Sequence, residues 1–146
     1  MWRAGYSKDG LGIVSGTSSA LAVLVATDIL QKGGNAMDAA IGASMAQIVI
    51  AGGSYISFAG LAVMVYYEAK TGKLYSLNGV FNKPLNFDSQ TCPANSQQES
   101  CLGSKVLVPG FMKSIEEARS RFGTLSLSTL LEPSIYFAEN GFTMDY

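Results

Sequence analysis

The apolar residues of the chain recur at spacings that predict two consecutive helices in its first third. Leu11 to Val14 is interpreted as a short strand before them. Ser18 or Ser19 can cap the first helix, which continues to Leu30 and is apolar nearly all round. The second helix is predicted from about Ala36 to Ile50. It carries small residues that let a neighbouring backbone come close, namely Ala39, Ala40, Gly42, Ala43 and Ala46.

The joint between these helices is predicted from the stretch Gln31 to Ala40. Gly33 and Gly34 can take the left-handed conformation that ends a helix. Asn35 can cap the next helix, and Asp38 lies in its first turn, where the helix dipole favours a negative charge. We therefore expect a helix-turn-helix joint here.

Two β-prone runs separated by a turn predict an antiparallel hairpin. Leu61 to Glu68 is rich in Val and Tyr and is interpreted as a core strand, with Lys73 to Asn78 as its partner. Ala69 to Gly72 form the turn between them. From Phe81 to Lys105 the composition changes to Asn, Ser, Gln, Pro and Asp, which predicts a long loop. Long loops in compact domains are often functional or disordered.

Two more helices are predicted toward the C-terminus. Pro109 suits the first turn of a helix that Gly123 ends. Another follows from about Ser128 to Asn140, and Pro133 within it is expected to be tolerated only near the start of a helical segment. No repeat, low-complexity tract or domain linker is visible, so we expect a single domain over residues 1–146.

Several of these segments together resemble one protein family. The joint has the pattern KGGNAxDAA from Lys32, the hairpin follows, VPG begins at Val108, RFGTL at Arg121 and AENGF at Ala138. In this order the motifs resemble the gamma-glutamyltranspeptidase family of N-terminal-nucleophile hydrolases, over nearly the whole chain. The resemblance implies an α+β fold, a partial four-layer αββα sandwich of which this chain supplies one incomplete portion.

The resemblance also implies a reaction. In that family a precursor cuts itself before a threonine, whose hydroxyl and new amine serve as nucleophile and base. No threonine of this chain matches the cleavage motif, so we expect no catalytic residue here. We expect instead a partner, either a small subunit or the remaining chain, that carries an N-terminal threonine. The implied substrate is a small-molecule amide of the gamma-glutamyl or glutathione type. The aspartates form no spaced cluster and Gly10 and Gly12 lack the context of a nucleotide-binding fingerprint, so we predict no metal and no cofactor.

The candidate substrate-binding residues are Asn78 and Val80. The family's large subunit contributes an arginine after the hairpin, which holds the alpha-carboxylate of the glutamyl donor by a bidentate ion pair. Val80 stands at that position and can neither donate a hydrogen bond nor carry charge. Lys83 would not reproduce the planar fork, so we interpret it as a solvated loop charge. In Ala51 to Leu61, bulky side chains such as Tyr55 replace a glycine-dense family segment, which indicates a reshaped site.

Composition and charge exclude some classes of partner and of catalytic mechanism. The 146 residues, 48% of them hydrophobic, are enough for the core of one domain. A formal net charge of -1 without a basic cluster argues against nucleic acid as a partner. The absence of histidine excludes Ser-His-Asp and Cys-His catalysis by this chain alone. Cys92 and Cys101 lie in one polar loop, where a local disulfide and two free thiols are about equally expected.

Two observations bear on where the protein resides. A disulfide would imply an oxidising compartment, whereas no signal-peptide pattern follows Met1, so the interpretation leans toward the cytoplasm. From Ala39 to Tyr67 no charged residue occurs, which is long enough to cross a bilayer. Because Gly52 and Gly53 interrupt this run, we expect a buried helix, a glycine-rich loop and a core strand instead of a membrane span.

Three interpretations of the function follow. The favoured one is the N-terminal portion of a gamma-glutamyltranspeptidase-like hydrolase or transferase, inactive without the threonine-bearing subunit. The second is a catalytically dead remnant that acts as a binding or assembly subunit. The third is a diverged member whose substrate has no amino-acid carboxylate to clamp. In each case an incomplete sheet would leave exposed edges, so we expect the isolated chain to associate or to be poorly soluble.

Overall fold

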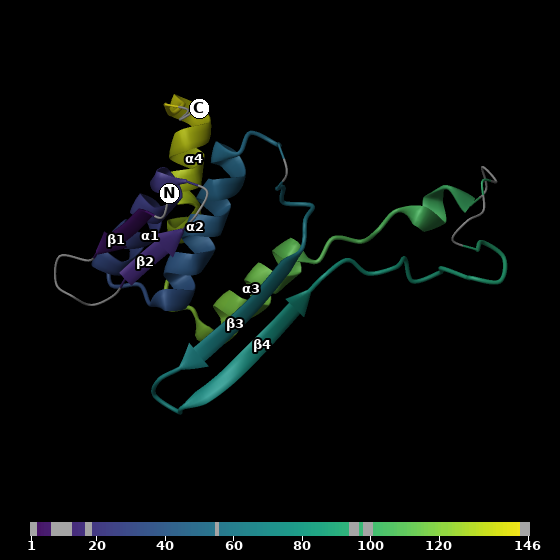
Figure 1. Cartoon of the computed structure of the whole chain (residues 1–146), viewed down its shortest axis with the longest axis horizontal. Helices are drawn as coiled ribbons and strands as arrows, with labels where there is room; N and C mark the ends of the chain where they lie inside the picture. The colour runs from purple at the N-terminus through teal and green to yellow at the C-terminus, as the bar shows by residue number, and fades with distance from the viewer. Residues whose placement is uncertain are drawn as a thin grey trace. The chain divides into compact units, whose positions relative to one another are not determined.

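The computed structural model describes residues 3–6, 13–16, 19–54, 56–93, 97 and 101–143. These residues form helices and antiparallel strand pairs, so the expected α+β class is confirmed (Figure 1). They divide into two compact units. Unit 1 combines the described residues up to Ser57 with those from Ile115 onward, and unit 2 is Phe58–Ser114. The expectation of a single domain stays a prediction.

Unit 1 is built from packed helices beside a short strand pair. Strands β1 (Arg3–Tyr6) and β2 (Ile13–Gly16) are antiparallel. Helix α2 (Ala36–Ile50) packs against both α1 (Ala20–Gln31) and α4 (Leu127–Asn140), and Figure 1 shows the three helices side by side. Large buried side chains from these helices, Ile29, Met37, Ile41, Met45 and Leu130, form the core of the unit.

The small residues of α2 allow this close packing. A Cβ atom added at Gly42 would lie 2.0 Å from Cδ1 of Ile29 and 3.5 Å from the carbonyl oxygen of Leu130. Ala39 and Ala46 of the same helix are buried. The prediction that a neighbouring backbone comes close to this helix is therefore confirmed.

The helix joint forms as predicted. Ser19 caps α1 and lies at the predicted place, while the alternative cap Ser18 is outside the described residues, as are Leu11 and Gly12 of the predicted strand. Gly33 has a positive φ of 87°, as a helix end of this kind requires, whereas Gly34 does not. Asn35 caps α2 in a reciprocal capping box with Asp38.

Unit 2 contains the predicted hairpin. Strands β3 (Ala62–Glu68) and β4 (Lys73–Gly79) pair antiparallel, with Ala62 opposite Gly79 and Glu68 opposite Lys73. Half-buried and exposed residues alternate along both strands, so one face of the hairpin is covered and the other is open. The interpretation of residues 61–68 as a core strand is therefore wrong for one face, because Val63, Val65 and Tyr67 are exposed.

The long loop after the hairpin is partly ordered. It carries a single turn of 3-10 helix, η2 (Gly103–Lys105), and returns to the hairpin through an isolated antiparallel bridge between Asn82 and Val108. Helix α3 (Phe111–Phe122) follows, with its first four residues in unit 2 and the others in unit 1.

Two expectations about proline are wrong. Helix α3 begins at Phe111, so Pro109 lies before the helix and not in its first turn. Pro133 lies well inside α4, which begins at Leu127, although such a residue was expected only near a helix start. A proline at this position gives up one backbone hydrogen bond, and the packing of α4 on α2 offsets that loss.

The helices in the described part of the chain are too short or too polar to cross a bilayer. The run without charge from residue 39 to 67 is divided in the structure among α2, a turn region and β3.

Candidate functional site

The two residues that were predicted from the sequence to bind substrate lie at the end of strand β4 and directly after it. Asn78 lies opposite Val63 in the hairpin register and is exposed. Val80 follows the strand directly and is 40% exposed. Both side chains are therefore accessible to a partner or ligand at the end of the hairpin.

A tight backbone junction fixes this end of the strand. A Cβ atom added at Gly79 would lie 1.7 Å from Oγ of Ser114 and 3.1 Å from the carbonyl oxygen of Ala62. A Cβ atom at Gly110 would lie 2.4 Å from the carbonyl oxygen of Gly79. Glycine is thus required at both positions, because any side chain would push β4 away from the segment that leads into α3.

Hydrogen bonds hold the segment opposite Gly79. The buried hydroxyl of Ser114 donates to the carbonyl oxygen of Gly110 over 2.8 Å, and the backbone N–H of Phe111 donates to Gly60 over 3.1 Å. The family-like VPG segment, Val108 to Gly110, thereby lies against Gly79, the last residue of the strand that carries Asn78. The structure therefore brings together two segments that were matched separately in the sequence.

Lys83 is exposed, as a solvated loop charge would be, but it also has an aromatic contact. Its Nζ lies 4.4 Å from the centroid of the Phe87 ring. The lysine is thus directed toward its own loop. Tyr55, the bulky residue noted in the glycine-poor segment, lies outside the described residues.

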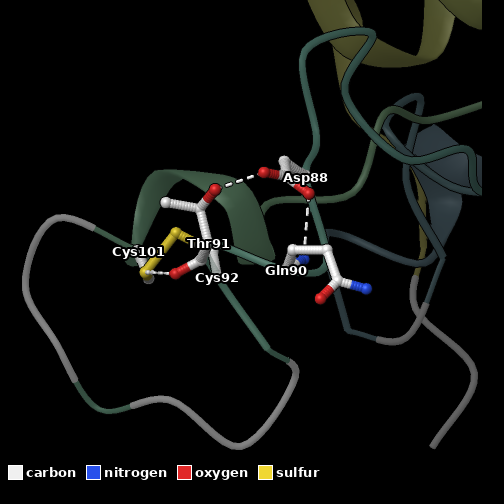
Figure 2. Close-up of a disulfide and its surroundings, with 5 residues drawn as sticks. All are labelled: Asp88, Gln90, Thr91, Cys92 and Cys101. Carbon is white, nitrogen blue, oxygen red and sulfur yellow. Dashed lines mark hydrogen bonds between the residues drawn. A yellow bond between two sulfur atoms is a disulfide. The ribbon is translucent and has the colours of Figure 1, made fainter.

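The loop that begins at Phe81 contains a disulfide between Cys92 and Cys101, with Cα atoms 5.4 Å apart (Figure 2). Of the two alternatives left open by the sequence, the structure has the local disulfide. Such bonds persist in oxidising compartments, so this bond speaks against the cytoplasmic leaning, which itself stays a prediction.

A second polar cluster lies in unit 1, at the helix joint. The carboxylate of Asp38 is fully buried and accepts hydrogen bonds from the backbone N–H of Asn35 over 3.0 Å and from the Thr124 hydroxyl over 2.6 Å. The backbone N–H groups of Thr124 and Leu125 donate to it as well, over 3.1 and 3.3 Å. The Asn35 amide donates to the carbonyl oxygen of Phe122 over 2.6 Å. These contacts form a clamp, the Asp38 clamp, between the joint and the RFGTL segment.

The charge state of Asp38 follows from this clamp. Burial acts to raise the pKa of the carboxyl, but the hydrogen bonds from Thr124, Asn35 and Leu125 outweigh burial and hold the pKa below its ordinary value. Asp38 is therefore an anion at neutral pH. Sequence reasoning placed it correctly in the first turn of α2 but missed its partner, because Thr124 is 86 positions away.

Apart from Thr124 of the Asp38 clamp, several threonines make local hydrogen bonds. Thr27 donates to the carbonyl oxygen of Val23 over 2.9 Å, Thr71 bonds to Glu68 and Thr91 to Asp88. Within the described part of the chain, acidic, histidine and cysteine side chains do not gather into a group that could hold a metal ion.

Comparison with known proteins identifies relatives for most of the chain. The family described as Gamma-glutamyltranspeptidase matches residues 22–146. The glutathione hydrolase proenzyme of Bacillus subtilis (strain 168) is 32% identical over 94% of this chain and 24% of its own length. The acylase ACY 1 proenzyme of Pseudomonas sp. (strain V22) is 31% identical over 88% of this chain and 25% of its own length. The chain thus spans about a quarter of the length of these curated relatives.

Solved structures give the same result. The crystal structure of Helicobacter pylori gamma-glutamyltranspeptidase superposes with a TM-score of 0.68 at 30% identity, covering 86% of this chain and 37% of the other. The sequence matches and the structural match each cover most of the chain, and this chain belongs to the gamma-glutamyltranspeptidase family.

Proposed function

We propose that this chain is the N-terminal large-subunit portion of a gamma-glutamyltranspeptidase-like hydrolase or transferase. The observation that carries the proposal is the family match over residues 22–146, which spans only about a quarter of the length of proenzyme relatives. The reaction would be acyl transfer from a gamma-glutamyl or related amide to water or an amine, through an acyl-threonine intermediate. The threonine and its amine would belong to a partner chain or to further sequence.

The open face of the hairpin supports the proposal that this chain is one portion of a larger fold. It presents Val63, Val65 and Tyr67 of β3 beside Leu74 of β4, each between 59% and 70% exposed. Contiguous exposed apolar side chains on a strand pair are typical of a surface that another layer covers. We propose that this face packs against the second sheet of a four-layer αββα sandwich, which the partner segment completes.

In this arrangement the chain would supply binding surface and not catalytic groups. Asn78 lies on the open face, and its side-chain amide can donate to and accept from an amide substrate. Val80 beside it offers only apolar contact. The position that would clamp an amino-acid carboxylate is therefore neutral.

The uncharged side chain of Val80 favours the same reaction on a different class of substrate. A substrate without an alpha-carboxylate would lose nothing from the absence of a guanidinium at Val80. The relative from Pseudomonas strain V22 is named an acylase, so the family includes members whose names point to another acyl substrate. An acyl amide of this kind should therefore be assayed together with glutathione as a substrate.

The second candidate function is a binding or assembly subunit that has lost catalysis. The specific observation in its favour is again Val80, which can neither donate a hydrogen bond nor carry charge. The open hairpin face would then serve assembly alone.

The experiment that separates these functions is purification of the protein from its native source with intact-mass analysis. A co-purifying polypeptide whose first residue is threonine is the result expected for an enzyme. Hydrolysis assays with glutathione and with acyl amides then rank the substrates by kcat/KM. Absence of any threonine-first polypeptide, with no activity on either class, would leave the assembly function.

Substitution of Val80 by arginine tests the carboxylate position in the assembled enzyme. If the proposed geometry is right, Val80→Arg lowers KM for gamma-glutamyl donors and leaves kcat/KM for substrates without the carboxylate unchanged or reduced. Val80→Leu is the matched control, since it adds bulk without charge. Equal effects of both substitutions on all substrates would contradict the proposed role of this position.

A further inference from the structure

The two sulfur atoms of the Cys92–Cys101 disulfide have unequal surroundings. Cys101 is buried, with 1% of its surface exposed, whereas Cys92 is half-buried. Figure 2 shows both cysteines beside Thr91, with Asp88 and Gln90 on the turn that precedes them. A reagent from solution therefore reaches one side of the bond more easily than the other.

The turn before Cys92 is held by hydrogen bonds that do not depend on the disulfide. The Asp88 carboxylate accepts from the backbone N–H of Gln90 over 2.9 Å and from the Thr91 hydroxyl. The backbone N–H of Cys92 donates to the carbonyl oxygen of Asp88 over 3.0 Å. Cys92 would therefore stay in place when the sulfur–sulfur bond opens.

The Cys101 sulfur has a hydrogen-bond acceptor within reach. Its Sγ lies 3.8 Å from the carbonyl oxygen of Thr91, so a free thiol at this position finds a hydrogen-bond acceptor without moving. Thiolates attack disulfides at the sulfur they can reach, and the other sulfur departs. The burial of the two residues thus makes Cys92 the point of attack and Cys101 the leaving group.

We propose that the Cys92–Cys101 disulfide is a thiol–disulfide exchange site for small soluble thiols, with Cys92 as the residue that takes the mixed disulfide. This site is separate from the proposed acyl transfer and does not depend on it. It makes the loop after the hairpin responsive to the thiol concentration around the protein.

The exchange is balanced without an added oxidant. The thiolate of the small thiol attacks Cys92 Sγ and forms a new sulfur–sulfur bond, while the Cys92–Cys101 bond breaks and Cys101 leaves as a thiolate that takes a proton from water. In the reverse step the Cys101 thiolate attacks Cys92 Sγ and expels the small thiol. A second small thiol can instead attack the sulfur atom of the small thiol that is bound to Cys92. This yields the small disulfide and the Cys92 thiol.

The bond lies in the loop that begins beside the candidate site. The loop leaves the hairpin after Val80 and returns at Val108, where Asn82 and Val108 exchange two backbone hydrogen bonds of 2.9 and 2.8 Å. Because this bridge closes the base of the loop, opening the disulfide would loosen the described residues beside the two cysteines, 88–93 and 101–105, and leave the hairpin end unchanged. The site acts on the outer part of the loop.

The test is incubation of the whole chain with reduced glutathione as the probe, followed by rapid acid quenching and peptide mapping of the mixed disulfide. We expect the glutathionyl group on Cys92 in at least about tenfold excess over Cys101, because access controls attack. In concentrated urea, where both cysteines are exposed, this preference should disappear. Equal labelling in the folded protein, labelling mainly on Cys101, or no exchange at a glutathione concentration that opens the disulfide in urea would overturn the proposal.

Single-cysteine variants provide a second readout. With oxidised glutathione, the Cys101→Ser variant should form its mixed disulfide about tenfold faster than the Cys92→Ser variant, again because of access. The double variant is the control and should take no label. Should either variant fail to fold, the mapping of the unsubstituted chain still decides. Hydrogen exchange should rise in residues 88–93 and 101–105, and not in β3 or β4, when the disulfide is opened.

Discussion

Asp38 shows how one carboxylate can hold together two distant segments. It is fully buried, yet it receives hydrogen bonds from backbone groups on both sides of the clamp and from the Thr124 hydroxyl. A buried anion with this many donors is stabilising only while it stays charged, because a neutral acid or amide accepts fewer of them. The stability of unit 1 should therefore depend on the charge of this residue.

Substitution of Asp38 by asparagine should lower the free energy of unfolding by about 3 kcal/mol near neutral pH, because hydrogen bonds to a charged group are lost and donors are left unsatisfied. Denaturant unfolding followed by circular dichroism measures the change. Asp28→Asn is the matched control, since Asp28 pairs with Lys32 on the surface, each side chain about half exposed, and should cost less than about 1 kcal/mol. Similar losses for both variants would contradict the clamp.

The contribution of the Asp38 carboxylate to the free energy of unfolding should change with pH in a defined direction. The folded state holds the pKa of Asp38 below its ordinary value, so the unfolded state binds the proton more readily. The clamp contributes fully above the unfolded pKa of about 4 and is lost as pH falls through the lower folded pKa. The difference in unfolding free energy between the unsubstituted chain and Asp38→Asn should thus shrink below about pH 4. A difference that is constant down to the acid transition would mean that the carboxylate charge is not the cause.

At the scale of elements, the hairpin end depends on close contact between β4 and the start of α3. The Ser114 hydroxyl occupies the space that a side chain at position 79 would need. This contact is specific to two residues, so a pair of substitutions can test it.

Gly79→Ala should lower the free energy of unfolding by about 1–3 kcal/mol, because an inserted methyl group forces β4 and α3 apart. In the Ser114→Gly background the same change should cost at least about 1 kcal/mol less, since the main obstacle is gone. Gly103→Ala is the control: no atom lies within 4 Å of a Cβ there, and its effect should stay within about 0.5 kcal/mol. Additive effects of the substitutions at 79 and 114 would show that the contact is looser than described.

Local signals predicted most elements, and long-range contacts explain what they missed. Helix α2 has the predicted bounds, Ala36–Ile50, because its cap and first-turn acid are adjacent in sequence. Pro133 lies inside α4 against expectation, because packing on α2 outweighs a local preference. The position of Val80 could be predicted from the hairpin, but the contact of Gly79 with Ser114 and the pairing of Asp38 with Thr124 could not. Nothing near these residues in the sequence specifies their partners.

At the scale of the whole molecule, the open hairpin face is the surface through which we expect association. Val63, Val65, Tyr67 and Leu74 together form an apolar surface that water covers in the isolated chain. Burial of such a surface is favourable by roughly 25 cal/mol per Å² of apolar area, so contact with another copy or another segment is expected.

Val65→Lys should therefore reduce self-association of the isolated chain, measured by sedimentation velocity over a range of concentrations. The residue is 70% exposed, so the lysine fits without disturbing the covered face. Ser120→Lys on exposed α3 adds the same charge without removing apolar area and is the matched control. If the unsubstituted chain is monomeric at all concentrations, or if both variants behave alike, the hairpin face is not the cause of association.

The Asp38 clamp also sets the order in which the protein can fold during synthesis. Its two sides are 86 positions apart, and all of unit 2 lies between them in the chain. The helix joint leaves the ribosome first, but its buried carboxylate has no Thr124 to bind until the hairpin, the disulfide loop and α3 have been made. Unit 2, which is one continuous segment of the chain, can fold before that moment. A nascent chain that stops short of Thr124 would hence expose the joint, so quality control by chaperones and proteases would act on unit 1 and spare the hairpin.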